Sequence, residues 1–305
     1  MAISRQQLAK ELEPGLNALF GLEYSRYDNQ HAEIFTTESS DRAFEEEVML
    51  SGFAGAPTKQ EGASVVFDQA NEAYTARYTH ETIALAFSIT EEAIEDNLYD
   101  RLAQRYTRAL ARSMSNTKQV KAAQVLNQAQ FTAVTGGDGV PLIANNHPLS
   151  NGGTFSNVLA TAADLNETSL EQALIDIQGF VDERGLKIAL SGRKMIIPKE
   201  LQFTAERLMK STLRTGTADN DINAINNMGM VPEGYRVNNF LTDTDSFFLL
   251  TDVPNGLKHF ERSPIKTALE GDFDTGNVRF KARERYSFGF SDPRCIFGNG
   301  NLPTS

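Results

Sequence analysis

The chain has 305 residues, of which 40% are hydrophobic, and a formal net charge of −11. This length is enough for about two domains, and the composition is that of a globular protein with a core. Proteins that grip nucleic acid are usually basic, so the acidic balance argues against sequence-specific binding of DNA or RNA. The single cysteine, Cys295, excludes intramolecular disulfides and fits a reducing compartment. No apolar run approaches the roughly 18 residues of a membrane span, so we expect a soluble protein, made in a cytoplasm, without membrane contact.

The N-terminal part predicts an arm rather than a domain. Residues 1–30 begin with a short amphipathic helix that we expect to break at Pro14 and Gly15, followed by a second short apolar segment. A frayed terminus fits this composition equally well.

Residues 44–89 predict a long β-hairpin. One limb is FEEEVMLSGFA, residues 44–54, and the segment after it contains the Gly, Pro and Ser residues of a turn. The return limb alternates in two phases, and the change between Tyr78 and Ile83 requires a bulge or a break between two strands. A two-stranded ribbon of this length is not stable alone in water, so we expect a neighbouring subunit to cover it.

Residues 90–131 predict one long helix, because they contain no Pro or Gly and are rich in good helix formers. Thr90 is the expected cap, and Gly136 and Gly137 lie beyond the expected end. Such a helix is roughly 55–60 Å long. Its apolar positions recur every four residues and therefore wind around the helix, so that it meets different neighbours along its length. These positions are Ile94, Leu98, Leu102, Tyr106, Leu110 and Met114. The alternative is a coiled-coil dimer helix, but no sustained repeat of 3.5 residues supports it.

After a loop rich in Gly and Asn, the middle of the chain predicts a compact α/β layer. A helix is expected at 167–183, a short buried strand at 193–197, and a further helix directly after Pro198. Two more short strands are expected within 235–253, around a turn.

Candidate catalytic or ligand-binding groups are weakly supported. The GGDG sequence at 136–139 follows a helix and lacks the spacing of a phosphate-binding loop. His147 has no nucleophile signature nearby, so a structural histidine is the favoured interpretation over a catalytic base. Asp243 and Asp245 fit a turn better than a cation site. A hydrolase using His147, Asp272 or Asp274 remains as an alternative of a different class.

The strand NVRFKARERYSFGF, residues 277–290, is the most regular segment. Apolar side chains share one parity, and four cations share the other, with a spacing of about 6.5–7 Å along one face of a strand. We consider a solvated face, a nucleic-acid surface that the net charge disfavours, and an ion-pair ladder with acidic residues on the hairpin of another subunit. The residues of that proposed inter-subunit contact are Arg279, Lys281, Arg283 and Arg285 on the strand and Glu45, Glu46 and Glu47 on the hairpin.

The order of these parts resembles the major capsid proteins of tailed bacteriophages with the Hong Kong 97-type fold. The loop at 137–157, GDGVPLIANNHPLSNGGTFSN, looks like the loop after the long helix in the major head subunits of Mu-like phages. Residues 257–264, LKHFERSP, and 272–300, DFDTGNVRFKARERYSFGFSDPRCIFGNG, look like the closing part of such proteins. The resemblance covers nearly the whole chain.

The resemblance implies an α+β fold and a purely structural role, without enzymatic activity or cofactors. It divides the chain into an N-terminal arm (1–30), an E-loop hairpin (31–89), a peripheral domain with the spine helix (90–131 and 256–290) and an axial domain (132–255 and 291–305). Hexamers and pentamers of such a subunit would form an icosahedral head in the virion. This head would enclose double-stranded DNA without sequence-specific binding, and would assemble in the bacterial host cytoplasm with scaffolding, portal and decoration proteins.

The resemblance raises two further features of the family and one alternative identity. Some relatives lose an N-terminal scaffolding segment, and the arm here is too short for one, which implies a separate scaffolding protein or a mature form. Some relatives cross-link a lysine of the hairpin to an asparagine of the peripheral domain, and Lys59 and Asn277 occupy suitable places. The rival is an encapsulin-type shell, which shares the fold and encloses cargo enzymes.

Overall fold

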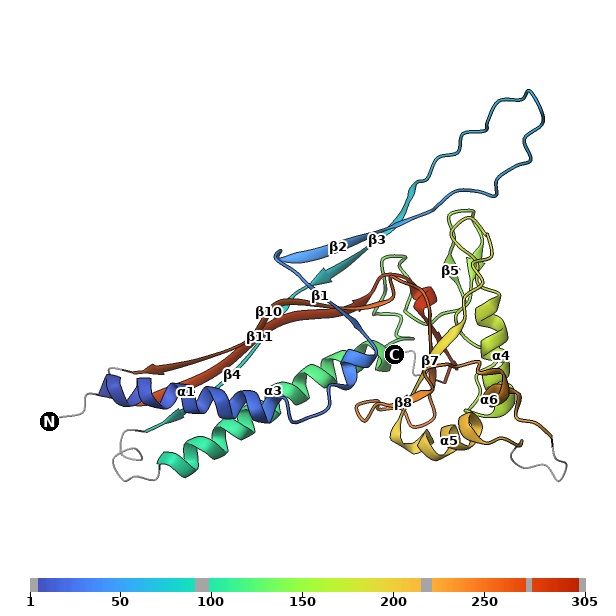
Figure 1. The fold of residues 1–305 in the computed structure, drawn as a ribbon. Helices are drawn as coiled ribbons and strands as arrows, with labels where there is room; N and C mark the ends of the chain where they lie inside the picture. Colours follow the sequence, from blue (N-terminus) through green and yellow to red (C-terminus); the bar gives the residue numbers. More distant parts are fainter. Residues whose placement is uncertain (1–4, 91–98, 215–220, 273–275, 302–305) are drawn as a thin grey trace.

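The structure, a computed structural model, describes residues 5–90, 99–214, 221–272 and 276–301. Figure 1 shows an elongated molecule in which a long limb of helices and strands is joined to a compact end, while a hairpin projects away from both. A four-stranded sheet runs along the limb, and a second four-stranded sheet lies in the compact end. The limb sheet consists, in order, of β1 (Thr36–Ser39), β10 (Leu257–Gly271), β11 (Val278–Phe290) and β4 (Glu81–Ile89).

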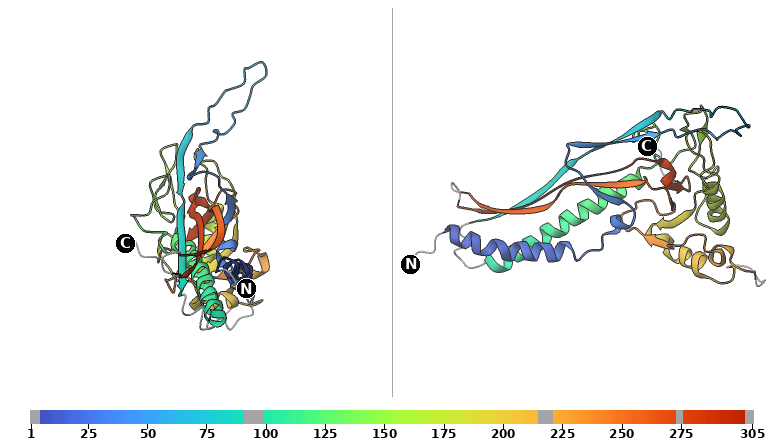
Figure 2. Two further views of the ribbon diagram at one scale, coloured as in Figure 1. Left: turned by 90° about the vertical axis from the view of Figure 1, so that its left-hand side faces the viewer. Right: turned by 45° about the horizontal axis from the view of Figure 1, so that its top comes forward.

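Two helices, α1 (Arg5–Tyr24) and α3 (Tyr99–Asn127), cover one face of the limb sheet (Figures 1 and 2). Phe20 of α1, Met114 of α3 and Phe280 of β11 meet in the core between them. The other face of the sheet has no helix on it in these views. The alternation along β11 follows from this one-sided burial, because its inward side chains reach the helices and its outward side chains reach solvent.

The long helix α3 is confirmed, although its end and its buried face differ from the prediction. Residues 91–98, including its expected first turns, lie outside the described residues. The helix ends at Asn127, whose side-chain amide donates to the carbonyl of Phe240 at 3.1 Å and accepts from the amide of Thr242 at 3.0 Å. Beyond Asn127, the backbone amides of Ala129 and Phe131 donate to carbonyls three residues earlier, so the chain continues as turns and the expected extension of the α-helix to residue 131 is wrong.

The buried positions of α3 advance by three and four residues, as on a straight helix, rather than by four throughout. Leu110 and Met114 are buried as expected, but the side chain of Tyr106 is 48% exposed. The first half of α3 packs into the core of the limb, whereas Ala122 and Leu126 pack into the core beneath the sheet of the compact end. The expectation that this helix meets different neighbours along its length is therefore confirmed.

The N-terminal helix α1 is continuous through Pro14, so the expected break at this residue is wrong. Leu16 and Phe20, which follow the proline, are buried against α3 and β11. A proline inside a helix costs about 3 kcal/mol, and this tertiary burial opposes that cost. The described part of the arm is thus packed on the subunit.

The projecting hairpin is formed by β2 (Phe44–Leu50) and β3 (Glu72–Thr79), which pair antiparallel. The expected break in the return limb is confirmed and falls at His80, which hydrogen bonds to Ser40 at 2.9 Å and to Ser287 at 3.0 Å. Beyond it, β4 leaves the hairpin and pairs with β11. The second half of the expected return limb therefore belongs to the limb sheet.

Among the described residues, the compact end contains the second sheet and three α-helices. The sheet order is β12 (Ile296–Gly298), β9 (Phe248–Thr251), β7 (Gly192–Ile197) and β8 (Tyr235–Val237). One face packs on α4 (Glu167–Gln178), α5 (Gln202–Lys210) and α6 (Ala224–Met228), and the other packs on the end of α3. Burial on both faces explains why β7 ends in three consecutive buried apolar residues, Met195, Ile196 and Ile197.

The remaining elements are short. They are β5 (His147–Pro148), β6 (Thr154–Phe155) and the 3-10 helices η1 (Gln30–Glu33), η2 (Lys199–Leu201) and η3 (Pro293–Cys295). One expectation needs correction, because the helix α4 ends before Gly179 instead of reaching residue 183. The two short strands expected within 235–253 are confirmed as β8 and β9, which flank β7 on opposite sides.

Candidate assembly surfaces

The acidic limb of the hairpin is held by contacts within the chain. Glu47 forms an ion pair with Lys258 of β10. Glu45 accepts a hydrogen bond of 2.6 Å from the hydroxyl of Ser40. Glu46 is exposed and lies 3.8 Å from the guanidinium of Arg77 on β3. Of the three glutamates, Glu46 therefore has the carboxylate most accessible to a second molecule.

The loop between β2 and β3, residues 51–71, exposes several apolar side chains. Phe67 is 94% exposed, and the side chains of Phe53, Val65 and Val66 are each more than half exposed. The loop is tied to the compact end by Arg184, which donates to the carbonyl of Gln69 at 2.8 Å and pairs with Asp68 at 3.4 Å. An exposed apolar loop of this kind marks an interaction surface.

The base of the hairpin is packed tightly on the rest of the chain. The ring of Tyr78 lies edge-on to Phe260, with centroids 4.8 Å apart, and its hydroxyl hydrogen bonds to Ser291. A Cβ atom on Gly289 would lie 2.7 Å from the Tyr78 ring. A Cβ on Gly137 would lie 2.6 Å from the carbonyl oxygen of Thr75. Glycine is required at both positions because the hairpin approaches so closely.

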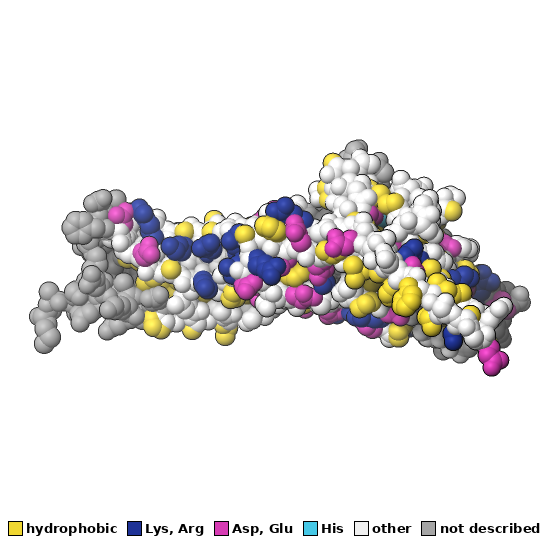
Figure 3. All heavy atoms as spheres, turned by 90° about the horizontal axis from the view of Figure 1, so that it is seen from above, with side chains coloured by type: hydrophobic (Ala, Val, Ile, Leu, Met, Phe, Trp, Pro, Cys, Tyr) yellow, Lys and Arg dark blue, Asp and Glu magenta, His cyan; other side chains and the backbone are white. Residues whose placement is uncertain are grey.

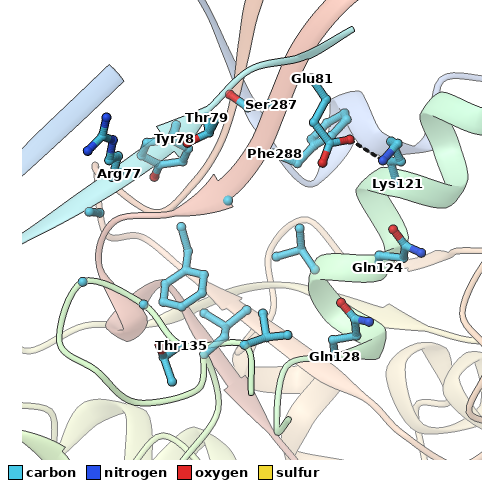
Figure 4. A pocket seen from close by; sticks show the side chains of 18 of the residues that line it. Arg77, Tyr78, Thr79, Glu81, Lys121, Gln124, Gln128, Thr135, Ser287 and Phe288 are labelled. Atoms are coloured by element: carbon cyan, nitrogen blue, oxygen red, sulfur yellow. Dashed lines mark hydrogen bonds and ion pairs between the residues drawn. The ribbon is translucent and has the colours of Figure 1, made fainter. Parts of the chain in front are cut away.

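Beside this base lies an open hollow of about 530 Å³, shown in Figure 4. Lys121 and Gln124 of α3 and Gln128 just after it face the hollow, and Tyr78 lies on the opposite side. An ion pair between Lys121 and Glu81 crosses its upper edge in this view. The lining mixes amides, hydroxyls and apolar rings without a catalytic arrangement among the described residues.

The basic strand is confirmed as β11, and its cations lie on the outer face of the limb sheet. Arg279, Lys281 and Arg283 are exposed, and Arg285 is half-buried. Figure 3, which looks onto this face, shows Lys and Arg side chains along the limb. Two of the cations have partners at the end of β10, because Arg279 lies 2.5 Å from Asp272 and Lys281 lies 3.7 Å from Glu270.

The two halves of the expected charge ladder are not joined within one subunit. Across the described residues, no ion pair links Glu45, Glu46 or Glu47 to the cations of β11. Lys59 and Asn277 are also apart, since the 51–71 loop and the turn between β10 and β11 lie at opposite ends of the molecule (Figures 1 and 2). A bond between those two residues would have to join two subunits.

A buried charge on β11 was missed at the sequence level. Glu284 occupies the inward parity between Ala282 and Tyr286, is 1% exposed, and pairs with Lys118 of α3 at 3.5 Å. Burial raises the pKa of Glu284, and the neighbouring Lys118 opposes this shift. The signal was present, because a glutamate at an apolar position of an alternating strand calls for a buried partner.

The described residues of the hydrolase alternative, His147 and Asp272, are each engaged with structural partners. His147 is fully buried, with its ring nitrogens 2.6 Å from Asp138 and 3.2 Å from Asn157. It therefore clamps the loop after α3, as the structural interpretation expected. Asp272 pairs with Arg279, and Asp274 lies outside the described residues.

In the turn at 243–245, a hydrogen bond between the carboxyl groups of Asp245 and Asp243 stabilises the protonated form of Asp245 and raises its pKa to about 6. In the described part of the chain, no group of three or more His, Cys, Asp or Glu side chains is placed to hold a metal ion. Within the same ranges, no helix is long and apolar enough to cross a membrane.

An elongated subunit with a projecting apolar loop and a charged sheet face belongs to the class of proteins that assemble with copies of themselves. The family within this class follows from comparison with known proteins. A model of the phage capsid protein family matches residues 73–299, well over half of the chain. The chain belongs to the phage capsid protein family, and it is a structural major capsid protein. An encapsulin-type shell is not favoured, because the matching family is that of phage capsids.

Solved structures support the same fold. The virus-like particle from Pyrococcus furiosus has a TM-score of 0.52 and 10% identity, over 93% of this chain and 97% of that chain. The procapsid of bacteriophage JBD30 has a TM-score of 0.52 and 16% identity, over 97% of this chain and 75% of that chain. The Mycobacterium phage Che8 structure has a TM-score of 0.51 and 15% identity, over 88% and 89%. Identities this low establish a shared fold and nothing further. No curated protein matches the chain.

Proposed function

We propose that this subunit has the Hong Kong 97-type fold and builds an icosahedral head that encloses double-stranded phage DNA. The observation that carries the proposal is the projecting β2–β3 hairpin, whose loop exposes Phe67 and its apolar neighbours to solvent. A single subunit gains nothing from this exposure, whereas a shell buries it between copies. The match to the phage capsid protein family supports a structural, non-enzymatic role.

The domain division follows the resemblance. The arm is residues 1–30, the E-loop is 31–89, the peripheral domain is 90–131 with 256–290, and the axial domain is the remainder. In support, the limb and the compact end have separate sheets. We propose hexamers and pentamers as the assembly units, with scaffolding, portal and decoration proteins as partners and the bacterial cytoplasm as the place of assembly.

Electron microscopy of the purified protein, together with its sedimentation profile, tests the proposed function. Closed shells or ring-shaped capsomers are the expected result. A protein that stays monomeric even with its native scaffolding protein contradicts the capsid proposal.

For the contact between subunits, we propose that Glu45, Glu46 and Glu47 of one copy meet Arg279, Lys281, Arg283 and Arg285 of the next. Arg283 and Arg285 are the sharper targets, because Arg279 and Lys281 already pair within the chain. The double reversal R283E/R285E should block assembly. The matched variant E46K should restore part of it without removing the Glu47–Lys258 pair. If R283E/R285E assembles normally, the ladder is not an assembly contact.

We also propose a cross-link between Lys59 of one copy and Asn277 of a neighbouring copy. Denaturing electrophoresis and mass spectrometry of mature particles test it, with covalent oligomers as the expected result. A single band of monomer mass contradicts it, and K59R serves as the control that keeps the charge.

A further inference from the structure

The helix α3 carries a concentration of positive charge that is unusual for this chain. Residues 101–127 contain Lys and Arg but no Asp or Glu, in a protein whose net charge is −11. Arg105, Arg108 and Arg112 are spaced by three and four residues, so they lie along one stripe of the helix. All three are exposed, and they span about 10 Å along the helix axis.

This arginine stripe (Arg105, Arg108 and Arg112) points away from the core. The buried face of α3 is marked by Leu110, Ala111 and Met114, which pack against the limb sheet and α1. The stripe therefore lies on the helix side of the limb, whereas the cations of β11 lie on its sheet side. The limb thus has a basic surface on each side, and the two surfaces differ in whether their cations pair with acidic residues of the same chain.

The arginines of the stripe have no acidic partner in the described part of the chain, unlike Arg279 and Lys281 of β11. Arg108 and Arg112 line a shallow groove of about 470 Å³ between α3 and the end of α1. Glu23 is the carboxylate in this groove, and it is already engaged by Arg26 at 3.6 Å and by the hydroxyl of Tyr27 at 3.3 Å.

The chemistry of the groove fits a phosphodiester better than a protein surface. The guanidinium group presents a planar fork that binds phosphate through two parallel hydrogen bonds. Ser113 and Asn116 add neutral donors, and the lining is polar apart from Ala109 and the ring of Tyr27. A protein partner needs an apolar centre to its interface, whereas contact with nucleic acid rests on the phosphate backbone.

We propose that Arg105, Arg108 and Arg112 form the surface by which the subunit contacts the phosphate backbone of enclosed DNA. The inference rests on the proposed function and adds to it that the helix side of the limb faces the interior. Three phosphate contacts per subunit are individually weak and independent of sequence, so the DNA is held without being trapped. Repetition over many copies makes the summed contact substantial.

Titration of the purified subunit with a mixed-sequence DNA duplex at low ionic strength tests the inference. For three phosphate contacts, the logarithm of the binding constant should fall against the logarithm of the salt concentration with a slope of about −3. R105Q/R108Q/R112Q should bind at least about tenfold more weakly, with a flat slope. R105K/R108K/R112K should keep the slope. K187Q/K199Q/K210Q, which removes the same charge from the compact end, should bind as the wild type does.

Two results overturn the inference. One is a triple glutamine variant that binds the duplex as tightly as the wild type. The other is a polyglutamate probe that binds more tightly than the duplex, since this would assign the stripe to an acidic protein. The unfolding midpoint should stay unchanged because the three side chains are exposed.

A second measurement places the contact in the particle. Modification of arginines by phenylglyoxal should be several-fold slower at the stripe in DNA-filled particles than in emptied ones, and unchanged at Arg283. Equal modification in both particles overturns the inference and leaves the capsid function intact. A wild-type chain that forms no particles even with its native scaffolding protein contradicts the capsid function, and the duplex titration still decides the binding.

Discussion

Lys118 of α3 and Glu284 of β11 form an ion pair at 3.5 Å in which both side chains are almost fully buried. The hydroxyl of Tyr24, at the end of α1, donates to the same carboxylate at 3.3 Å. This contact joins three segments that are far apart in the sequence. It also fixes α3 against the sheet at the middle of the limb, where the helix passes from one core to the next.

Removing Lys118 should destabilise the subunit strongly, because it leaves the carboxylate of Glu284 buried without its partner. We expect K118M to lower the free energy of unfolding by about 3–5 kcal/mol. The matched control is K121M, three residues along the same helix, where the pair with Glu81 is partly exposed and should contribute about 0–1 kcal/mol. Chemical denaturation measures the stability of both variants. Equal losses in K118M and K121M would contradict the strong contribution of the buried Lys118–Glu284 pair.

Stability should fall in mild acid because two histidines are buried. Burial lowers the pKa of His31 to about 4 and that of His259 to about 3, and the charge of Lys118 adds to both shifts. Below the unfolded value near 6.5, the unfolded chain binds protons that the folded chain does not bind. The contribution of the two histidines to the free energy of unfolding should therefore be fully present above about pH 6.5 and decline as the pH falls towards about 4.

The histidine effect is measured by denaturation at a series of pH values. The decline should amount to a few kcal/mol, because a pKa that is lower by one in the folded state than in the unfolded state corresponds to about 1.4 kcal/mol. The variant H31F/H259F should lose most of the decline between pH 6.5 and 5. A variant as acid-sensitive as the wild type would show that other groups cause the effect.

The close approach of the hairpin to the loop after α3 predicts a large effect of one methyl group. In G137A, the new Cβ would lie 2.6 Å from the carbonyl of Thr75, so the backbone of the hairpin must move. We expect a loss of about 1–3 kcal/mol and faster proteolysis within 51–71. In the control G21A, the added methyl meets open space in a helix and should stabilise by up to about 1 kcal/mol. If G137A is proteolysed at the wild-type rate, the base of the hairpin is not packed closely on the loop after α3.

The exposed loop should matter for assembly and not for the fold. Phe67 is 94% exposed, so F67S should change the free energy of unfolding by less than about 0.5 kcal/mol. Because the ring is expected to be buried between copies, the same variant should reduce the yield of assembled particles. Light scattering during assembly checks this, with Q60S as a control in the same loop. Normal assembly of F67S would remove this residue from the contact surface.

Local sequence determined those features of this protein that depend on the pattern of residues within a single helix or strand. The absence of Gly and Pro predicted α3, the alternation of cations and apolar residues predicted β11, and the change of phase after Tyr78 predicted the break at His80. The order of these parts also indicated the capsid family, which the family match confirms. These features are legible because helix propensity and strand alternation depend on neighbours within a few residues.

Tertiary structure alone decided the features that depend on contacts between distant segments. The helix α1 continues through Pro14 because it packs on α3, and the end of α3 at Asn127 is held in place by side-chain contacts with residues 240–242. The strand β4 belongs to the limb sheet because β11 offers it a partner. Burial and pairing across the chain can outweigh the local cost of a proline or a lost helical turn, and no pattern in one segment records the partner that lies opposite it.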